Sequence, residues 1–339
     1  MQKLTDININ QKLLDTKDSR LELIIKGKNI NFSVISALRR TCISDVPIYS
    51  FNEIHFDSNS SIYNNDYLRT RIQSFPVRSI KNDIIFYDDT IEPENTEDNN
   101  AYTTENVLLE ENVKIAIGED DIIMSDTEEL SEKDNYNMLT MYVDIQNNDN
   151  KIIQVTTDNC KFYQNGSEIN NIYKKPLLIC KLKNEQKISL TAIVNLGIER
   201  TSTLYSPVSI CTYSEINENE YKFILESRGQ INEYRILYVA CMNILRRLEY
   251  LSELIPDDNK HLEGELNIDK MGHTMGNLLS NGLLLHDDVI YAGYSKPHLL
   301  DDKIIIKFKL KKSNIHSILN DIITLYKKLY ESLAKQFNK

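Results

Sequence analysis

The sequence predicts an α+β protein made of two related strand–helix units paired by long helices, with a β-rich domain inserted into the first unit. Residues 231–251 and 315–337 each repeat apolar residues at intervals of three and four, which is typical of long helices that pack on other helices. Residues 82–188 instead hold short strand-like runs between Asn, Asp and Gly turns. We therefore expect three domains: a discontinuous one over 1–81 and 189–256, the insert over 82–188, and a second pairing domain over 257–339.

The first unit begins with a strand at residues 20–26 and turns into a helix near Ser33. Pro47 ends this helix, because proline cannot continue one, and FNEIHF then resumes the alternation of a strand. A second short helix is expected in NNDYLRTRIQSFP. The apolar stripe of the first helix, at steps of three, three and four, is Phe32, Ile35, Leu38 and Cys42.

The two long helices carry matching stripes. HLEGELNID, HTMGNLLSNGLLL, DVIYAGYSKP and KIIIKFKLK lie between them and read as a strand, a helix and two strands joined as a hairpin. Apolar seams of this length predict that the two long helices pack on each other. The earlier stripe is Tyr234, Leu237, Cys241, Ile244, Leu248 and Leu251. The later stripe is Ile315, Leu319, Ile322, Tyr326, Leu329, Leu333 and Phe337.

An internal similarity indicates that the two units are related. SVISALRRTCISDVPIYS and TMGNLLSNGLLLHDDVIYAG both run from a helix through Asp-Val into a strand. Leu38 aligns with Leu279 at an offset of 241 residues, and Asp45 with Asp288 at an offset of 243. The pattern predicts two strand–helix–strand units in one chain, each with an apolar helix face to bury.

Acidic residues are concentrated in one segment. The chain carries a net charge of −11, yet residues 83–135 hold eighteen acidic residues against two lysines, so the remainder nets +5. Such a segment is typical of a mobile loop or of a docking surface for a basic partner, and both alternatives stay open. Neither part shows the dense Lys/Arg face of a nucleic-acid-binding protein. Without a signal peptide or an apolar run of ~18 residues, we expect an intracellular protein with no membrane contact.

Residues that carry chemistry do not gather in the sequence. The six histidines are scattered, and no nucleophile with a base can be nominated. MGHTMGN, residues 271–277, lacks the Gly-Lys-Ser/Thr of a phosphate loop and is better explained as a tight entry to a packed helix. We expect no catalytic residue, no metal ligand and no cofactor. The cysteines, spaced too widely for a zinc or redox motif, are Cys42, Cys160, Cys180, Cys211 and Cys241.

Two stretches resemble a known family. Residues 36–77, SALRRTCISDVPIYSFNEIHFDSNSSIYNNDYLRTRIQSFPV, are similar to the signature of the α-like subunits of multisubunit RNA polymerase. This family includes the bacterial α N-terminal domain and the third-largest subunit of eukaryotic polymerase II. GIERTSTLYSPV, residues 197–208, matches the family's GIGKEHAKWSPV at both ends. It departs at Glu199, at residues 201–203, and at Tyr205, where the family has Trp.

The C-terminal part resembles a second member of the same family. HTMGNLLSNGLLLHDDVIYAGYSKPH, residues 273–298, is similar to the eleventh subunit of polymerase II. The chain thus resembles two subunits fused, as in large cytoplasmic DNA viruses. The resemblance covers roughly residues 20–80 and 190–339, and 82–188 matches by position alone. Cellular relatives often carry a zinc-binding cysteine cluster there that this chain lacks, so we predict no zinc.

The resemblance implies a non-catalytic assembly platform of a DNA-directed RNA polymerase. The implied partners are the second-largest subunit and small adaptor subunits, with DNA reached only through the complex. The implied location is intracellular, in the host cytoplasm (a viral factory) and the virion. Two alternatives are a virion structural or interaction protein that uses the same fold, and a free-standing enzyme with its site in the insert.

The resemblance also implies which residues meet partners. Arginine suits the edge of the seam because its planar fork forms paired hydrogen bonds. The expected contacts to the large subunit are Arg39, Arg40, Arg71 and Arg200. The expected pairing interface is Phe32, Ile35, Leu38, Leu237, Cys241, Leu248, Leu278, Leu279, Leu319, Ile322, Tyr326 and Leu329.

Overall fold

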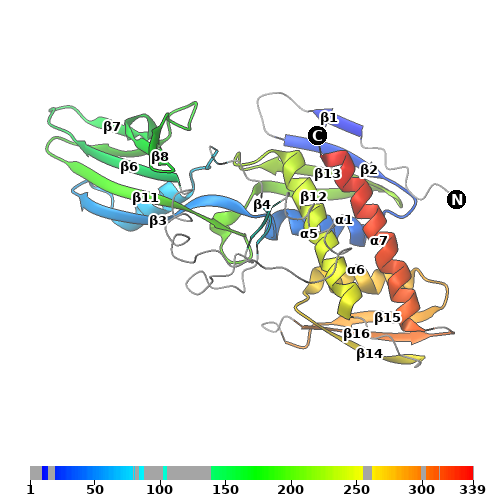
Figure 1. The fold of residues 1–339 in the computed structure, drawn as a ribbon. Helices are drawn as coiled ribbons and strands as arrows, with labels where there is room; N and C mark the ends of the chain where they lie inside the picture. Colours follow the sequence, from blue (N-terminus) through cyan, green and yellow to red (C-terminus); the bar gives the residue numbers. More distant parts are fainter. Residues whose placement is uncertain are drawn as a thin grey trace, which may run out of the picture. The chain divides into compact units, whose positions relative to one another are not determined.

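The chain folds into helices and antiparallel sheets, a mixed α+β architecture as the sequence predicts (Figure 1). The computed structural model describes residues 10–13, 20–78, 80, 84–87, 102–104, 139–254, 262–298, 303–312 and 314–338. It divides into two compact units. The first comprises 1–46, 208–227 and 232–339, and the second comprises 47–207 and 228–231. Most of the acidic segment, and the linker at 255–261, lie outside the described residues.

The described residues of the first unit form two antiparallel sheets. One has the order β1-β2-β13-β12 and the other the order β14-β16-β15. Alternate residues of β13 are buried, which is the period of a strand with one face on the core. The strands are β1 (Asn10–Leu13), β2 (Arg20–Lys26), β12 (Val208–Asn217), β13 (Glu220–Ser227), β14 (Glu263–Asp269), β15 (Val289–Ser295) and β16 (Lys303–Leu310).

In the described part of the first unit, the helices are α1 (Phe32–Ser44), α5 (Glu233–Leu254), α6 (His273–Leu284) and α7 (Ile315–Phe337). Asparagine is the N-cap residue of two of them, because its side-chain oxygen accepts a hydrogen bond from a free backbone N–H of the first turn. Asn31 accepts from Val34 at α1, and Asn314 accepts from His316 at α7. The long helices α5 and α7 lie side by side, and α1 packs on α5 and α6 (Figure 1).

The second unit is built on a five-stranded antiparallel sheet of order β3-β11-β6-β8-β9. Its inner face packs against α2 (Asn65–Gln73) and the pair β10-β7 around one apolar core. A separate pair joins β4 (Ile84–Tyr87) to β5 (Tyr102–Thr104). Short 3-10 turns are η3 (Thr157–Asn159) and η4 (Thr203–Tyr205). The remaining strands are β3 (Ile48–Asn59), β6 (Leu139–Gln146), β7 (Ile153–Thr156), β8 (Lys161–Gln164), β9 (Ser167–Ile169), β10 (Leu178–Leu182) and β11 (Lys187–Gly197).

One strand pairs differently in the two strand–helix–strand repeats that the internal similarity predicts. In the repeat near the C-terminus, β14 and β15 both pair with β16 in a single sheet. In the strand–helix–strand repeat near the N-terminus, β3 does not join the sheet that contains β2. It pairs along β11 instead, through a register that runs from Ile48 to Asn59. By packing, β3 and α2 therefore belong with the strands of the insert. The three-part division at 81/82, 188/189 and 256/257, which the sequence pattern predicts, stays a prediction.

Candidate functional site

The helices of the first unit enclose a continuous apolar seam, which we call the pairing core. Eleven of the twelve residues expected in a pairing interface are buried there, none more than 4% exposed. Burying a side chain of this size stabilises the fold by about 1.5–3 kcal/mol. The pairing core is Ile35, Leu38, Leu237, Cys241, Leu248, Leu278, Leu279, Leu319, Ile322, Tyr326 and Leu329.

Phe32 lies elsewhere, with its side chain 49% exposed. At about 100° per residue, the buried residues of α1 form one arc that includes Val34, Ala37 and Leu38. Phe32 falls outside this arc, so its expected burial in the seam is corrected. It lies instead on the opposite arc of α1, which we call the α1 outer face. This face consists of Phe32, Ser36, Arg39, Arg40 and Ile43, all exposed or partly exposed.

A buried hydrogen bond joins the two ends of the chain. The Tyr330 hydroxyl donates to the Val34 carbonyl at 3.0 Å, across 296 residues of sequence. The Tyr326 hydroxyl donates to the Leu278 carbonyl at 3.2 Å, which fixes α7 on α6. Burial raises the pKa of Tyr326 to about 12, and that of Tyr330 also rises because it is buried. Both hydroxyls therefore keep their protons at neutral pH and act as donors.

A buried ion pair fixes α5 on the end of α1. The two terminal nitrogens of Arg247 contact the two carboxylate oxygens of Asp45 at 3.0 and 3.1 Å. Asn243 donates to the backbone carbonyl of Asp45 at 3.3 Å. The Asp45 side chain is 5% exposed and the Arg247 side chain 20%. Sequence reasoning missed this contact, although Arg247 directly precedes Leu248 of the helix stripe.

Close helix packing explains one glycine of α6. A Cβ atom at Gly282 would lie 2.6 Å from Cγ2 of Ile322 and 2.9 Å from the hydroxyl of Tyr326. Only glycine lets α6 and α7 approach this closely. In MGHTMGN, Gly276 likewise lies against the ring of Tyr294. This agrees with the interpretation of that segment as the entry to a packed helix.

The four arginines predicted to contact the large subunit are divided between the two units, and three of them donate hydrogen bonds within the chain. Arg39 donates from Nε to the Cys211 carbonyl at 2.8 Å, and Arg40 donates from Nε to Oγ1 of Thr274 in α6 at 3.1 Å. In the second unit, Arg71 donates to the Leu178 carbonyl at 2.7 Å. Arg200 is exposed there. Arg39 and Arg40 are thus oriented by the packing of α1 on β12 and α6.

The cysteines are free thiols. Burial raises the pKa of Cys42 and Cys241, and it raises that of Cys160 to about 12 and that of Cys180 to about 11. Such thiols are poor nucleophiles at neutral pH. Among the described residues, no three His, Cys, Asp or Glu side chains are grouped as metal ligands. No helix in the described part of the chain is long and apolar enough to cross a membrane.

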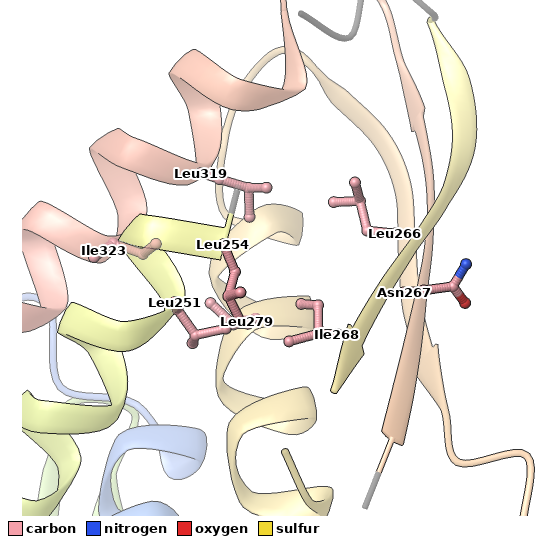
Figure 2. A pocket seen from close by; sticks show the side chains of 8 residues that line it. All are labelled: Leu251, Leu254, Leu266, Asn267, Ile268, Leu279, Leu319 and Ile323. Atoms are coloured by element: carbon pink, nitrogen blue, oxygen red, sulfur yellow. The ribbon is translucent and has the colours of Figure 1, made fainter. Parts of the chain in front are cut away.

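A small apolar pocket opens beside the pairing core, between the end of α5, α6, α7 and β14 (Figure 2). Seven apolar side chains line it, and the single polar residue, Asn267, points away from them (Figure 2). No titratable group lines this pocket, so it offers no acid, base or nucleophile. The apolar lining is Leu251, Leu254, Leu266, Ile268, Leu279, Leu319 and Ile323.

Comparisons with known proteins agree on one class of subunit. Residues 263–336 match the RNA polymerase Rpb3/Rpb11 dimerisation domain, a range that runs from the start of β14 almost to the end of α7. A DNA-directed RNA polymerase subunit of Acanthamoeba polyphaga mimivirus is 29% identical over 96% of this chain and 93% of its own length.

Two cellular relatives match parts of the chain. The RPAC1 subunit of RNA polymerases I and III of Saccharomyces cerevisiae is 28% identical, over 61% of this chain and 56% of that subunit. The RNA polymerase subunit Rpo11 of Sulfurisphaera tokodaii is 56% identical over 43 residues, which cover 13% of this chain and 46% of that subunit. Both are similar to this chain over about half of their own length.

Proposed function

We propose that this chain, an Rpb3/RPAC1-like RNA polymerase subunit with an Rpb11-like dimerisation domain, is a non-catalytic assembly platform that docks the second-largest subunit. Its two pairing halves lie in one polypeptide, so the α-like heterodimer is intramolecular. The resemblance to α-like subunits predicted from the sequence is confirmed by these relatives. The host cytoplasm and the virion are the location that we propose from the resemblance to viral polymerase subunits, and a relative of nearly equal length is viral.

The observation that carries this proposal is the pairing core. Helix α7, from the Rpb11-like part, packs on α5 and bonds through Tyr330 to α1, both from the remainder of the chain. An apolar seam of this kind is typical of obligate interfaces. A covalent tether also raises the effective concentration of one half at the other, to about millimolar for a suitable length.

We assign the contact with the second-largest subunit to the α1 outer face. Phe32 offers an exposed aromatic side chain, and Arg40 offers a guanidinium held in place by Thr274. Aromatic and arginine side chains are the residues that most often anchor protein interfaces. Arg71 and Arg200, in the second unit, are proposed as further contacts, and small adaptor subunits as further partners.

Substitution of the α1 outer face tests this assignment. We expect Phe32→Asp combined with Arg40→Glu to lower recovery of the second-largest subunit at least about tenfold, because an anchor is lost and a charge reversed. The measurement is co-expression with that subunit and pull-down of the tagged chain. Lys328→Glu, a charge reversal on an exposed position of α7, is the matched control. Recovery by the double variant at the control level, with both chains folded, would refute the assignment.

The alternatives have less support. A free-standing enzyme in the insert requires a pocket with convergent titratable groups, and among the described residues no three His, Cys, Asp or Glu side chains are grouped as metal ligands. A virion structural protein would not associate with a polymerase core. Turnover by the isolated chain would favour the enzyme, and absence of polymerase subunits from the pull-down would favour the structural protein.

A further inference from the structure

The five-stranded sheet of the second unit has an outer face whose residues are exposed or partly exposed. Directly opposed residues of antiparallel strands lie on the same face, so the register defines the members. One row crosses all five strands through Glu168, Tyr163, Thr140, Ile193 and Glu53.

The neighbouring row runs through Lys161, Tyr142, Thr191 and His55. Asp144 and Ser189 follow in register in the next row, where the Ser189 hydroxyl bonds to Asp57. We call this surface the outer sheet face.

Two aromatic rings stand together on the outer sheet face. Tyr142 and Tyr163 meet edge to face, with ring centroids 5.3 Å apart and planes at 87°. The Tyr142 side chain is nevertheless 44% exposed, although the inner face of the same strand is buried. A tyrosine ring offers an electron-rich surface on which a guanidinium stacks favourably.

Carboxylates outnumber cations around these rings. Four acidic side chains, Glu53, Asp57, Asp144 and Glu168, share the face with two lysines, Lys161 and Lys187. One of these lysines already pairs with Asp144, at 3.1 Å.

Some of the carboxylates are held in position by neighbours. Asn195 donates to Glu53 at 2.8 Å, which orients that carboxylate on the face. Glu53 and Glu168 end the same row, four strand spacings apart or roughly 19 Å. A segment that pairs with both carboxylates must therefore cross the whole sheet.

We propose that the outer sheet face docks an arginine-rich segment of a protein partner. Guanidinium groups would stack on Tyr142 and pair with the carboxylates at both ends of the tyrosine row. The negative charge of the face disfavours other possible ligands. Phosphates of a nucleic acid would meet a net negative surface, and so would a second copy of this face or the chain's own acidic segment. The inference is independent of docking through the α1 outer face.

Titration of the full chain with a short synthetic peptide of alternating arginine and glycine tests the proposal. Fluorescence anisotropy of the labelled peptide reports binding, and single-stranded oligouridylate of similar length is titrated in parallel. We expect Tyr142→Ala, and separately Glu53→Gln combined with Glu168→Gln, to weaken peptide binding about tenfold. We expect Tyr142→Phe, which keeps the ring, to bind the peptide within about twofold of wild type.

The matched control removes two charges away from the face. Glu185→Gln with Glu218→Gln neutralises two exposed carboxylates in turns, and its affinity should stay within about twofold of wild type. This control is needed because residues 83–135 attract any polycation. Equal losses in face and control variants, or no binding, would overturn the proposal. So would tighter binding of oligouridylate that depends on Tyr142, which would make the face a nucleic-acid platform.

Discussion

Replacing Arg247 with methionine is expected to lower the free energy of unfolding by about 3–5 kcal/mol. The substitution keeps most of the side-chain volume but removes the Arg247 guanidinium from the Asp45 side chain, which is 5% exposed. Removing one partner of a largely buried ion pair costs more than the net value of the pair itself. Urea unfolding followed by circular dichroism measures the loss.

Two further variants separate this explanation from a simple packing defect. Adding Asp45→Asn to Arg247→Met removes both charges and should recover a large part of the lost stability. Arg69→Met breaks an exposed ion pair in which Nη1 of Arg69 lies 2.8 Å from Oδ1 of Asp66. This substitution should cost less than about 1 kcal/mol. A loss for Arg247→Met no larger than that for Arg69→Met would contradict the role of the buried pair.

Replacing Tyr330 with alanine is expected to cost about 3–5 kcal/mol, because a fully buried ring is removed between α7 and α1. Tyr330→Phe isolates the hydroxyl. It removes the tyrosine hydroxyl from the Val34 carbonyl, which keeps the bond inside α1, and should cost about 0.5–1.5 kcal/mol. Tyr142→Phe, at an exposed position, should change stability by no more than about 0.5 kcal/mol.

Hydrogen exchange locates the effect of Tyr330→Phe. If this bond holds the two ends of the chain together, amides of α1 should exchange faster in the variant, along with those of α7. Faster exchange confined to α7 would show that the bond contributes nothing to α1.

The long helices were the most predictable part of the fold. Stripes at intervals of three and four identify α5 and α7 because a helix that packs along its length must keep one face apolar. Phe32 shows the limit of this reasoning. Its spacing fits the stripe, yet the buried arc of α1 is centred on other residues, and the helix was too short for spacing alone to fix that arc.

Contacts between distant segments were less predictable. The alternation in FNEIHF predicts a strand, but which sheet β3 joins depends on its pairing with β11, about 140 residues later in the chain. The pair of Asp45 with Arg247 and the bond from Tyr330 to Val34 depend equally on tertiary packing. The tyrosines of the outer sheet face occupy ordinary alternating positions in their strands, so only the register showed that they meet.

We propose that the Rpb11-like part and the remainder of the chain form one heterodimer without a second polypeptide. Native mass spectrometry after cleavage of the linker tests it most directly. A protease site inserted after Pro256 would separate the chain into two fragments outside the described elements. We predict that the cut fragments remain together as a one-to-one complex. Fragments that separate, each folded by itself, would contradict the account.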